Sequence, residues 1–318
     1  MKFFTIMINR RHIRAKVMQV LYSQRNNASD SKLDNQLKES MEDMYRLYLL
    51  MLSIFIKLRH REINQQEKAK KKYLKTNADI SPSMRFVNNF VLKKLDEDKV
   101  LKSEFENHKI TYWDQDVEYI ELIYKDLTSS KLYKEFLMSS KKSINDDIDF
   151  VIKMFKTIVV PNNKLYDYFQ DKKITWVDDF PVVNTFLVKL LLKVKANLKP
   201  GFFKSNLFRD KHDESFGLKL LKKTLQNSDS YNKEIILKTK NWDVERIATI
   251  DFVLLQMAIC EFHEFPSIPT KVTINEYIEL AKEYSTPKSN VFINGILDKI
   301  VKEYKNNQTL NKKGRGLI

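Results

Sequence analysis

Glycine and proline are scarce in this sequence, and their scarcity restricts the possible folds more than any other feature. Five glycines and seven prolines occur in 318 residues. A sheet-rich chain of this length would need many more of them to turn between strands. Leucine, isoleucine, lysine and glutamate are plentiful, and apolar residues recur with helical spacing through most of the chain. We therefore predict an all-α protein.

The helical spacing is clearest in residues 33–58, where apolar residues form one broad face. The lysine-rich stretch 60–79 is typical of a solvated helix end or a linker, and Ser81-Pro82 of a new helix start. Further amphipathic segments predict helices over 114–127, 131–138, 146–159, 164–170, 179–195, 215–226, 243–262, 273–284 and 289–305.

The opening of the chain is purely basic, because the first acidic residue is Asp30. Four cations begin an expected amphipathic helix: Arg10, Arg11, Arg14 and Lys16. Its apolar stripe consists of Ile13, Val17, Val20 and Leu21. Such a helix, with arginines beside its buried face and no neighbouring acid in the sequence, is suited to hold an anion such as nucleic acid. The alternative is an ordinary solvated helix end.

The charge of the whole chain agrees with an acidic partner. Lysine and arginine number 56 against 41 acids, a net charge of +15, and the isoelectric point is near 9.5. These cations are spread along the sequence, so the net charge supports nucleic-acid binding without proving it.

Cysteine usage and apolar runs indicate a cytoplasmic protein. Cys260 is the single cysteine, which excludes an intramolecular disulfide and suits a reducing compartment. Its apolar neighbours predict a buried side chain rather than a nucleophile. The longest apolar run, 47–56, is too short to span a membrane, and 3–8 precede the basic cluster, the reverse of a secretory signal. Met7, where the patterned sequence begins, is an alternative start to Met1.

The usual signatures of catalysis are missing, which favours a binding protein over an enzyme. The sequence has no Gly-rich phosphate loop, and its five histidines lack metal-ligand spacing. We therefore expect neither a metal nor a cofactor. The acid pairs Asp146-Asp147 and Asp178-Asp179 fall at expected helix starts, where capping explains them better than acid catalysis.

The last third of the chain resembles the NusB family of transcription antitermination factors. The resemblance rests on segments 241–247, 250–262, 268–269, 272–276, 279–282 and 292–300, including the string INE…ELAK…FINGILDKI. The run from Arg10 to Tyr22 resembles the arginine-rich first helix of the same family. Looser matches are Asp149, Phe150, Phe155, Asn163, Leu165 and Phe169.

This resemblance implies two small helical bundles that bind boxA-type RNA together with NusE, the small-subunit ribosomal protein. The complex would join elongating RNA polymerase and act chiefly on ribosomal RNA transcription. The predicted RNA-facing set is Arg10, Arg11, Arg14, Lys16, Gln256, Lys288, Ser289, Asn290 and Phe292. Tyr22 and Asp251 match positions that face NusE. Phe292 would stack on a base.

Two departures from the family pattern reduce the expected positive charge, because His12 and Gln256 stand where arginine is frequent. A third departure could restore one cationic contact, because Lys288 stands where an acid is frequent. A glycine in mid-helix, Gly295, suggests close approach of another helix or of a ligand, close packing being favoured. Asn275-Glu276 could cap or brace a neighbouring helix end.

The predicted division of the chain includes a large insertion after the first helix. We expect the first helix of an N-terminal bundle at 8–26, a helical insertion at 27–145 and the remainder of that bundle at 146–213. A C-terminal NusB-like bundle would cover 214–305, followed by a disordered basic tail at 306–318. Our hypothesis is that the insertion braces the bundles or widens the basic surface through the lysines of 68–75.

Two other functions were weighed against RNA-dependent antitermination. An RNA methyltransferase with a NusB-like domain would need a Gly-rich cofactor loop and a catalytic cysteine, and the sequence offers neither. A non-enzymatic interaction protein that kept the bundle but lost specific RNA binding stays open, as does a homodimer that hides the RNA-binding face.

Overall fold

The computed structural model describes residues 7–23, 30–71, 83–140, 142–239 and 247–317, and in these ranges it contains helices and no β-strand. The prediction of an all-α protein is confirmed. The elements are α1 (Arg10–Ser23), α2 (Asp30–Lys70), α4 (Phe90–Glu97), α5 (Lys99–Asn107), α6 (Tyr112–Gln115), α7 (Val117–Ser129), α8 (Lys131–Met138), α9 (Ile144–Met154), the π-helical turn η1 (Phe155–Val159), α10 (Asn163–Lys172), α11 (Trp176–Leu191), α12 (Lys211–Gln226), α13 (Ser228–Lys238), α14 (Thr249–Glu264), α15 (Thr270–Tyr284), α16 (Ser289–Asn306) and the 3-10 turn η3 (Gly314–Leu317).

These helices form two compact units. One contains Met7 and Glu42–Leu207, and the other contains Ile8–Met41 and the chain from Phe208 onward. Helix α2 therefore contributes to both units. No helix in the described ranges combines the length and the apolar character needed to cross a membrane.

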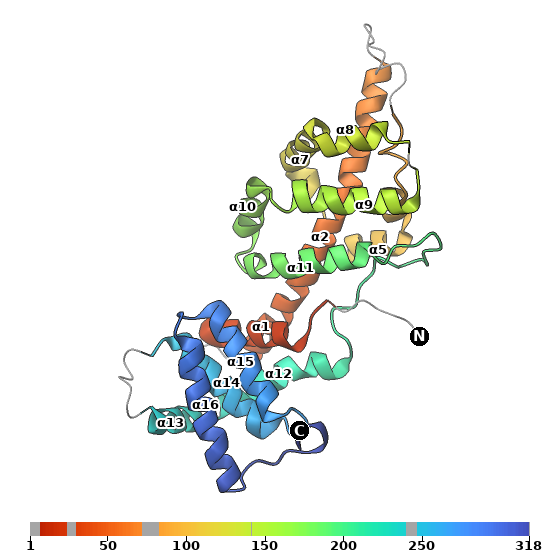
Figure 1. The fold of residues 1–318 in the computed structure, drawn as a ribbon. Helices are drawn as coiled ribbons and strands as arrows, with labels where there is room; N and C mark the ends of the chain where they lie inside the picture. The colour runs from red at the N-terminus through yellow and green to blue at the C-terminus, as the bar shows by residue number, and fades with distance from the viewer. Residues whose placement is uncertain (1–6, 24–29, 72–82, 141, 240–246, 318) are drawn as a thin grey trace. The chain divides into compact units, whose positions relative to one another are not determined.

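The later part of α2 is the centre of the first unit. Its side chains from 47 to 52 have no exposed surface, as expected for a helix that is apolar on all sides. Trp113 of α6 donates a hydrogen bond to Ser53 at 2.8 Å, and Trp176 of α11 donates one to the carbonyl of Asp43 at 2.9 Å. Figure 1 traces α2 past α9 and α11. The predicted boundary at 145/146 lies within this one unit.

The second unit packs α1 against the helices of the last third. Helices α14, α15 and α16 contact one another, while α1 crosses α12 and α14 (Figure 1). Ile13 and Val17 of α1 are fully buried. Helix α1, predicted as part of an N-terminal bundle, thus shares its core with the C-terminal bundle.

The acid pairs lie at helix starts, as predicted. Ser143 and Asp146 form a reciprocal capping box at the start of α9, and Asp147 accepts a hydrogen bond of 2.7 Å from the backbone N–H of Phe90. Asp178 and Asp179 occupy the first turn of α11, where carboxylates suit the helix dipole.

Several predicted boundaries differ from the structure. Of the two alternatives for 60–79, the helix end agrees with α2, which continues to Lys70, although Glu62 and Gln66 are buried rather than solvated. Helix α4 begins at Phe90, where the Asn89 side chain caps it. Residues 72–82, including Lys72, Lys75 and Ser81-Pro82, lie outside the described residues, as does 240–246 of the family-like string.

The predicted disordered tail also needs correction. Residues 307–317 follow α16 and contact the end of α14, with the backbone N–H of Lys313 donating to the carbonyl of Pro266 at 3.0 Å. Backbone groups that find such partners hold a segment in place without secondary structure of its own.

Candidate nucleic-acid interface

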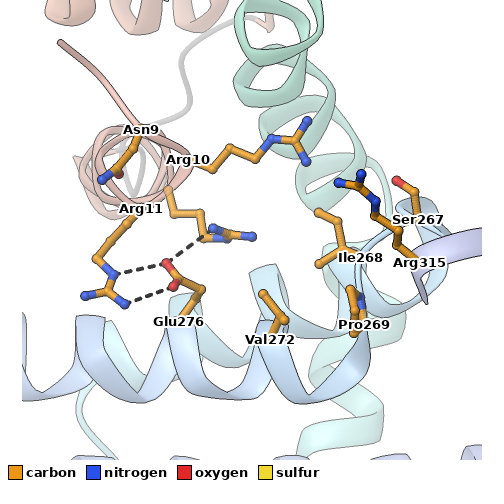
Figure 2. Close-up of a pocket in the computed structure, with 10 residues that line it drawn as sticks. Asn9, Arg10, Arg11, Ser267, Ile268, Pro269, Val272, Glu276 and Arg315 are labelled. Atoms are coloured by element: carbon orange, nitrogen blue, oxygen red, sulfur yellow. Dashed lines mark hydrogen bonds and ion pairs between the residues drawn. The ribbon is translucent and has the colours of Figure 1, made fainter. Parts of the chain in front are cut away.

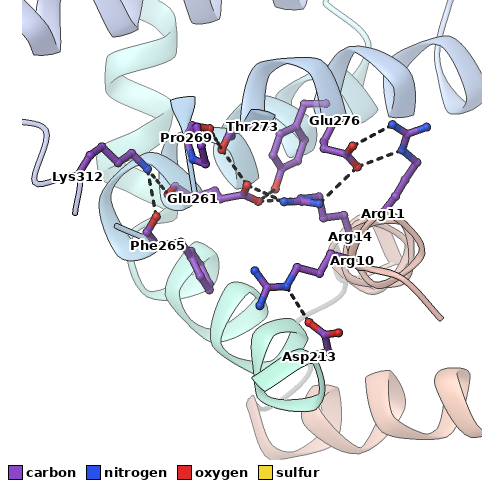
Figure 3. Close-up of polar contacts among 11 residues, drawn as sticks. Arg10, Arg11, Arg14, Asp213, Glu261, Phe265, Pro269, Thr273, Glu276 and Lys312 are labelled. Carbon is purple, nitrogen blue, oxygen red and sulfur yellow. Dashed lines mark hydrogen bonds and ion pairs between the residues drawn. The ribbon is translucent and has the colours of Figure 1, made fainter. Parts of the chain in front are cut away.

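Helix α1 presents its arginines because its apolar stripe is held tightly against α12. Gly217 makes this approach possible, since a Cβ at that position would lie 2.7 Å from the Cγ2 atom of Ile13. With Ile13 and Val17 directed into the core, the arginines at the start of α1 lie toward α12, α14 and α15 (Figure 3).

Arg14 forms a buried ion pair with Glu261 of α14. Its Nε and Nη2 atoms donate to the two carboxylate oxygens at 2.8 and 2.7 Å, and the two side chains are 3% and 0% exposed. Thr273 and Tyr277 of α15 also donate to this carboxylate, at 2.8 and 3.3 Å. Burial opposes the charge of Arg14, but the charge and hydrogen bonds of Glu261 outweigh it and raise the pKa of the guanidinium.

Arg11 makes a forked contact with Glu276 of α15. Its Nε and Nη2 atoms donate to the two carboxylate oxygens at 3.0 and 2.9 Å, and the Arg11 side chain is 41% exposed. Although burial acts the other way, the hydrogen bond from Arg11 and the charge of Arg14 lower the pKa of Glu276. Glu276 thus braces the start of α1, which is one of the two roles expected for Asn275-Glu276.

Arg10 lies on the α12 side of the same surface. Its Nε donates to Asp213 at 2.8 Å, and its guanidinium carbon is 5.0 Å from the ring centre of Phe216. The Arg10 side chain is 33% exposed, and only Nε is engaged by the carboxylate in the described residues. The remaining N–H groups leave it able to make further contacts with an anion.

The premise that no acid neutralises these arginines holds for the local sequence and is wrong for the folded chain. Three carboxylates from distant helices pair with them, at Asp213, Glu261 and Glu276. The arginines therefore have two roles. Arg14 holds α1 against α14 through a buried ion pair, while Arg10 and Arg11 remain partly exposed and available to a ligand.

An open cleft of about 810 Å³ begins at this surface. Asn9, Arg10, Arg11, Arg14, Glu276, Ser267, Ile268, Pro269, Val272 and Arg315 line it. Figure 2 shows that Arg10 from α1 and Arg315 from the C-terminal segment reach the same opening from different elements. The lining thus combines guanidinium groups, which can bind phosphate, with an apolar wall of Ile268, Pro269 and Val272.

His12 and Lys16 of α1 are not among the residues that line the cleft. His12 is partly buried, and burial followed by the charges of Arg11 and Lys16 lowers its pKa to about 4, so it is neutral near pH 7. Lys16 is only 3% exposed. Direct contact of Lys16 or Arg14 with RNA stays a prediction.

A second group of predicted residues lies at the start of α16. Asp251 is buried and accepts hydrogen bonds from Ser285 at 2.6 Å and Ser289 at 2.7 Å, so it fixes the start of α16 against α14. Lys288 is exposed, and Phe292 is 8% exposed. Of this set, Lys288 is the residue most open to a ligand.

Two further members of that group have polar side chains at intermediate exposure. Gln256 of α14 donates to Asn232 of α13 at 2.8 Å. The Oδ1 atom of Asn290 is buried without a hydrogen-bond partner among the described residues. Asn290 lies in the first turn of α16, two positions after the exposed Lys288.

The structure brings Arg10, Arg11 and Arg14 together but leaves the Lys288 group apart from them. The arginines meet α14 at Glu261 and the Lys288 group meets it at Asp251. Ten helical residues separate these two contacts, roughly 15 Å along the axis. Tyr22, at the end of α1, is 51% exposed, whereas Asp251 is 4% exposed. The predicted NusE contacts therefore differ in accessibility.

Sequence reasoning missed two carboxylates that hold the arginines and one arginine of the cleft, and it misjudged one glycine. Glu261 and Asp213 pair with arginines more than two hundred positions away, so no local pattern reveals them, and Arg315 was assigned to a disordered tail. Gly295 is exposed, and a Cβ there would meet nothing within 4 Å, so the preferred explanation of close helix packing is wrong.

Cys260 matches its prediction as a structural residue. The side chain is fully buried in α14, and burial raises the pKa of its thiol to about 12. A protonated, inaccessible thiol cannot act as a nucleophile in this state.

Comparisons with known proteins agree on one family. The sequence model of the NusB family matches residues 186–302. Transcription antitermination protein NusB of Salinibacter ruber is 41% identical over 112 residues, which are 35% of this chain and 70% of that protein. The proteins of the same name from Chloroherpeton thalassium and Geotalea daltonii are 39% and 40% identical over 118 residues, covering 37% and 36% of this chain and 56% and 77% of those proteins. No solved structure matches the chain.

Proposed function

Because the chain belongs to the NusB family, we propose that it is a non-enzymatic, RNA-binding transcription antitermination factor. It would bind boxA-type RNA together with NusE and act on elongating RNA polymerase, chiefly during ribosomal RNA transcription. The observation that carries this proposal is the open, arginine-lined cleft in the unit that contains most of the family match.

The exposed guanidinium groups are the proposed contacts to phosphate. Arg10 and Arg11 keep 33% and 41% of their side-chain surface exposed while each is oriented by a carboxylate. An oriented guanidinium loses less rotamer freedom on binding an anion than a free one. Arg14 would act through α1, because its side chain is only 3% exposed.

Lys288, Asn290 and Gln256 are the proposed second contact region, with Phe292 available for stacking if the start of α16 adjusts. Tyr22 is the proposed NusE contact, since a half-exposed aromatic residue is typical of a protein interface. The buried Asp251 would support that interface by holding α14 and α16 together.

The proposal is tested by titrating the whole protein with a fluorescently labelled boxA RNA and with a scrambled RNA of equal composition. The titrations are repeated with and without NusE across a salt series. We expect tighter binding to boxA, strengthened by NusE. Log affinity should fall with log salt, by roughly 0.7 for each phosphate contacted on a single strand.

Variants separate the cleft from the general positive charge. Arg10→Gln and Arg11→Gln should each weaken binding, whereas Lys299→Gln, an equal charge change on the exposed face of α16, should not. Arg11→Gln is the cleaner change, because Glu276 keeps its contact with Arg14 at 3.4 Å. Equal and weak binding to both RNAs, unaffected by NusE, would contradict the proposal and favour the interaction-protein alternative. Sedimentation at the same concentrations would reveal a dimer that hides the cleft.

A further inference from the structure

The C-terminal segment is attached to the end of α14 by specific contacts. Lys312 reaches back over the helix terminus, where its ammonium donates to the carbonyls of Glu261 at 3.3 Å and Phe265 at 3.1 Å (Figure 3). The backbone N–H of Lys313 donates to the carbonyl of Pro266 at 3.0 Å. A cation on the last carbonyls of a helix is favourable, because those groups lack partners within the helix.

A glycine then fixes the register of this segment. Gly316 is buried, and a Cβ at that position would lie 1.9 Å from the carbonyl oxygen of Pro266. No side chain fits there, so the backbone of η3 can approach the 265–269 loop only with glycine at 316. The neighbouring residue, Arg315, is thereby directed into the cleft that α1 lines.

Arg315 differs from the other arginines of the cleft because it has no ion pair among the described residues. Arg10, Arg11 and Arg14 each contact a carboxylate, whereas Arg315 is exposed and its guanidinium reaches the opening (Figure 2). Among the residues that line the cleft, Glu276 is the one carboxylate beside four arginines. Asp213 and Glu261 pair with Arg10 and Arg14, whereas the charge of Arg315 meets no carboxylate among the described residues.

We propose that Arg315 is a phosphate-binding residue of this cleft and that the attached C-terminal segment completes the RNA-binding surface. The inference rests on the proposed RNA-binding function and adds a contact that lies beyond the family match, which ends at 302. The ligand group is a phosphodiester of single-stranded RNA, whose sugar or base can contact the apolar wall at Ile268, Pro269 and Val272.

The first test compares Arg315→Gln with the matched charge control Lys299→Gln in the titrations with labelled boxA RNA. Loss of one phosphate contact should reduce the slope of log affinity against log salt by about 0.7. If Arg315→Gln and the unmodified protein bind equally at roughly 1 M salt, the variant should bind about fivefold more weakly at roughly 0.1 M salt. Lys299→Gln should leave both quantities within error of the unmodified protein. Circular dichroism melting confirms that each variant is folded.

The second test keeps the arginine and moves the segment. Gly316→Ala should displace the backbone from Pro266 and reproduce the weakening seen for Arg315→Gln. The double variant should bind no more weakly than Arg315→Gln alone, because both changes remove the same contact. Gly295→Ala is the control, since its added methyl group meets nothing within 4 Å.

The outcomes distinguish this inference from the function on which it rests. If Arg10→Gln weakens binding while Arg315→Gln and Gly316→Ala match their controls, RNA binding stands and the role of Arg315 is refuted. If the unmodified protein does not prefer boxA RNA, the proposed function fails, and the inference fails with it. Weakening by Arg315→Gln without any effect of Gly316→Ala would refute the positioning role of the segment.

Discussion

Replacing Arg14 by methionine should destabilise the second unit more than it changes the cleft surface. Methionine keeps the apolar stem of the side chain but is shorter than arginine and carries no charge, which leaves the carboxylate of Glu261 buried with only the hydroxyl groups of Thr273 and Tyr277 as donors. A buried carboxylate without a neighbouring cation lowers the stability of the folded state and favours its protonated form.

The expected loss is about 3–5 kcal/mol, which is the range for breaking a buried ion pair by removing one partner. The contact belongs in this range because both donor–acceptor distances are below 3 Å and neither side chain is more than 3% exposed. A typical domain has a free energy of unfolding of about 5–15 kcal/mol, so the change removes a large share. Each kcal/mol lowers Tm by roughly 2–4 °C at this size.

The assay is urea unfolding followed by circular dichroism, with near-ultraviolet signals used to separate the transitions of the two units. The double variant Arg14→Met/Glu261→Gln is the comparison that tests the reasoning, because it removes the unpaired carboxylate that destabilises Arg14→Met. We expect the double variant to be more stable than Arg14→Met. A loss below about 1 kcal/mol in the single variant, typical of a surface pair, would refute the reasoning. So would a double variant whose loss is the sum of the two single losses.

Three further predictions concern pH, packing and reactivity. The pKa of the His12 imidazole is about 4 in the folded protein and about 6.5 in the unfolded chain. Between these pH values the unfolded chain binds a proton that the folded protein does not, so the free energy of unfolding falls as the pH drops from 6.5 to 4. His12→Gln should flatten this dependence in urea unfolding at pH 7 and 4.5; an unchanged dependence would exclude His12 as a source. Gly217→Ala should destabilise by about 1–3 kcal/mol, because the methyl group would overlap Ile13, whereas Gly295→Ala should stabilise by up to about 1 kcal/mol. Cys260, buried and with a pKa of about 12, should react with a thiol reagent only on unfolding; fast labelling of the native protein would contradict its position.

The helices of the last third were predictable because their apolar residues repeat strongly. Segments 273–284 and 289–305 differ from α15 and α16 by a few residues at most. Helix α13 was missed because its apolar residues are not segregated: Tyr231 and Ile235 are buried, while Ile236 and Leu237 are exposed. Local periodicity identifies a helix only when one face is clearly apolar.

The candidate site was predictable only in part, because its geometry depends on residues far apart in the chain. The position of Arg10 and Arg11 on the first helix could be inferred from spacing. Their pairing with Asp213 and Glu276 could not, since it depends on how α1 crosses other helices. The contribution of Arg315 depends on the close backbone approach at Gly316 and on the contacts of Lys312 and Lys313 with the end of α14, which no sequence pattern encodes.

The long sequence separations within the second unit have a consequence for synthesis. The partners of Arg10, Arg14 and Arg11 follow them by 203, 247 and 265 residues. At ~5–20 residues per second, Arg11 is synthesised roughly 13–53 s before Glu276. The stretch Glu42–Leu207 is continuous and can fold during that interval. Throughout it, the nascent first helix carries its arginines without the carboxylates that later hold them.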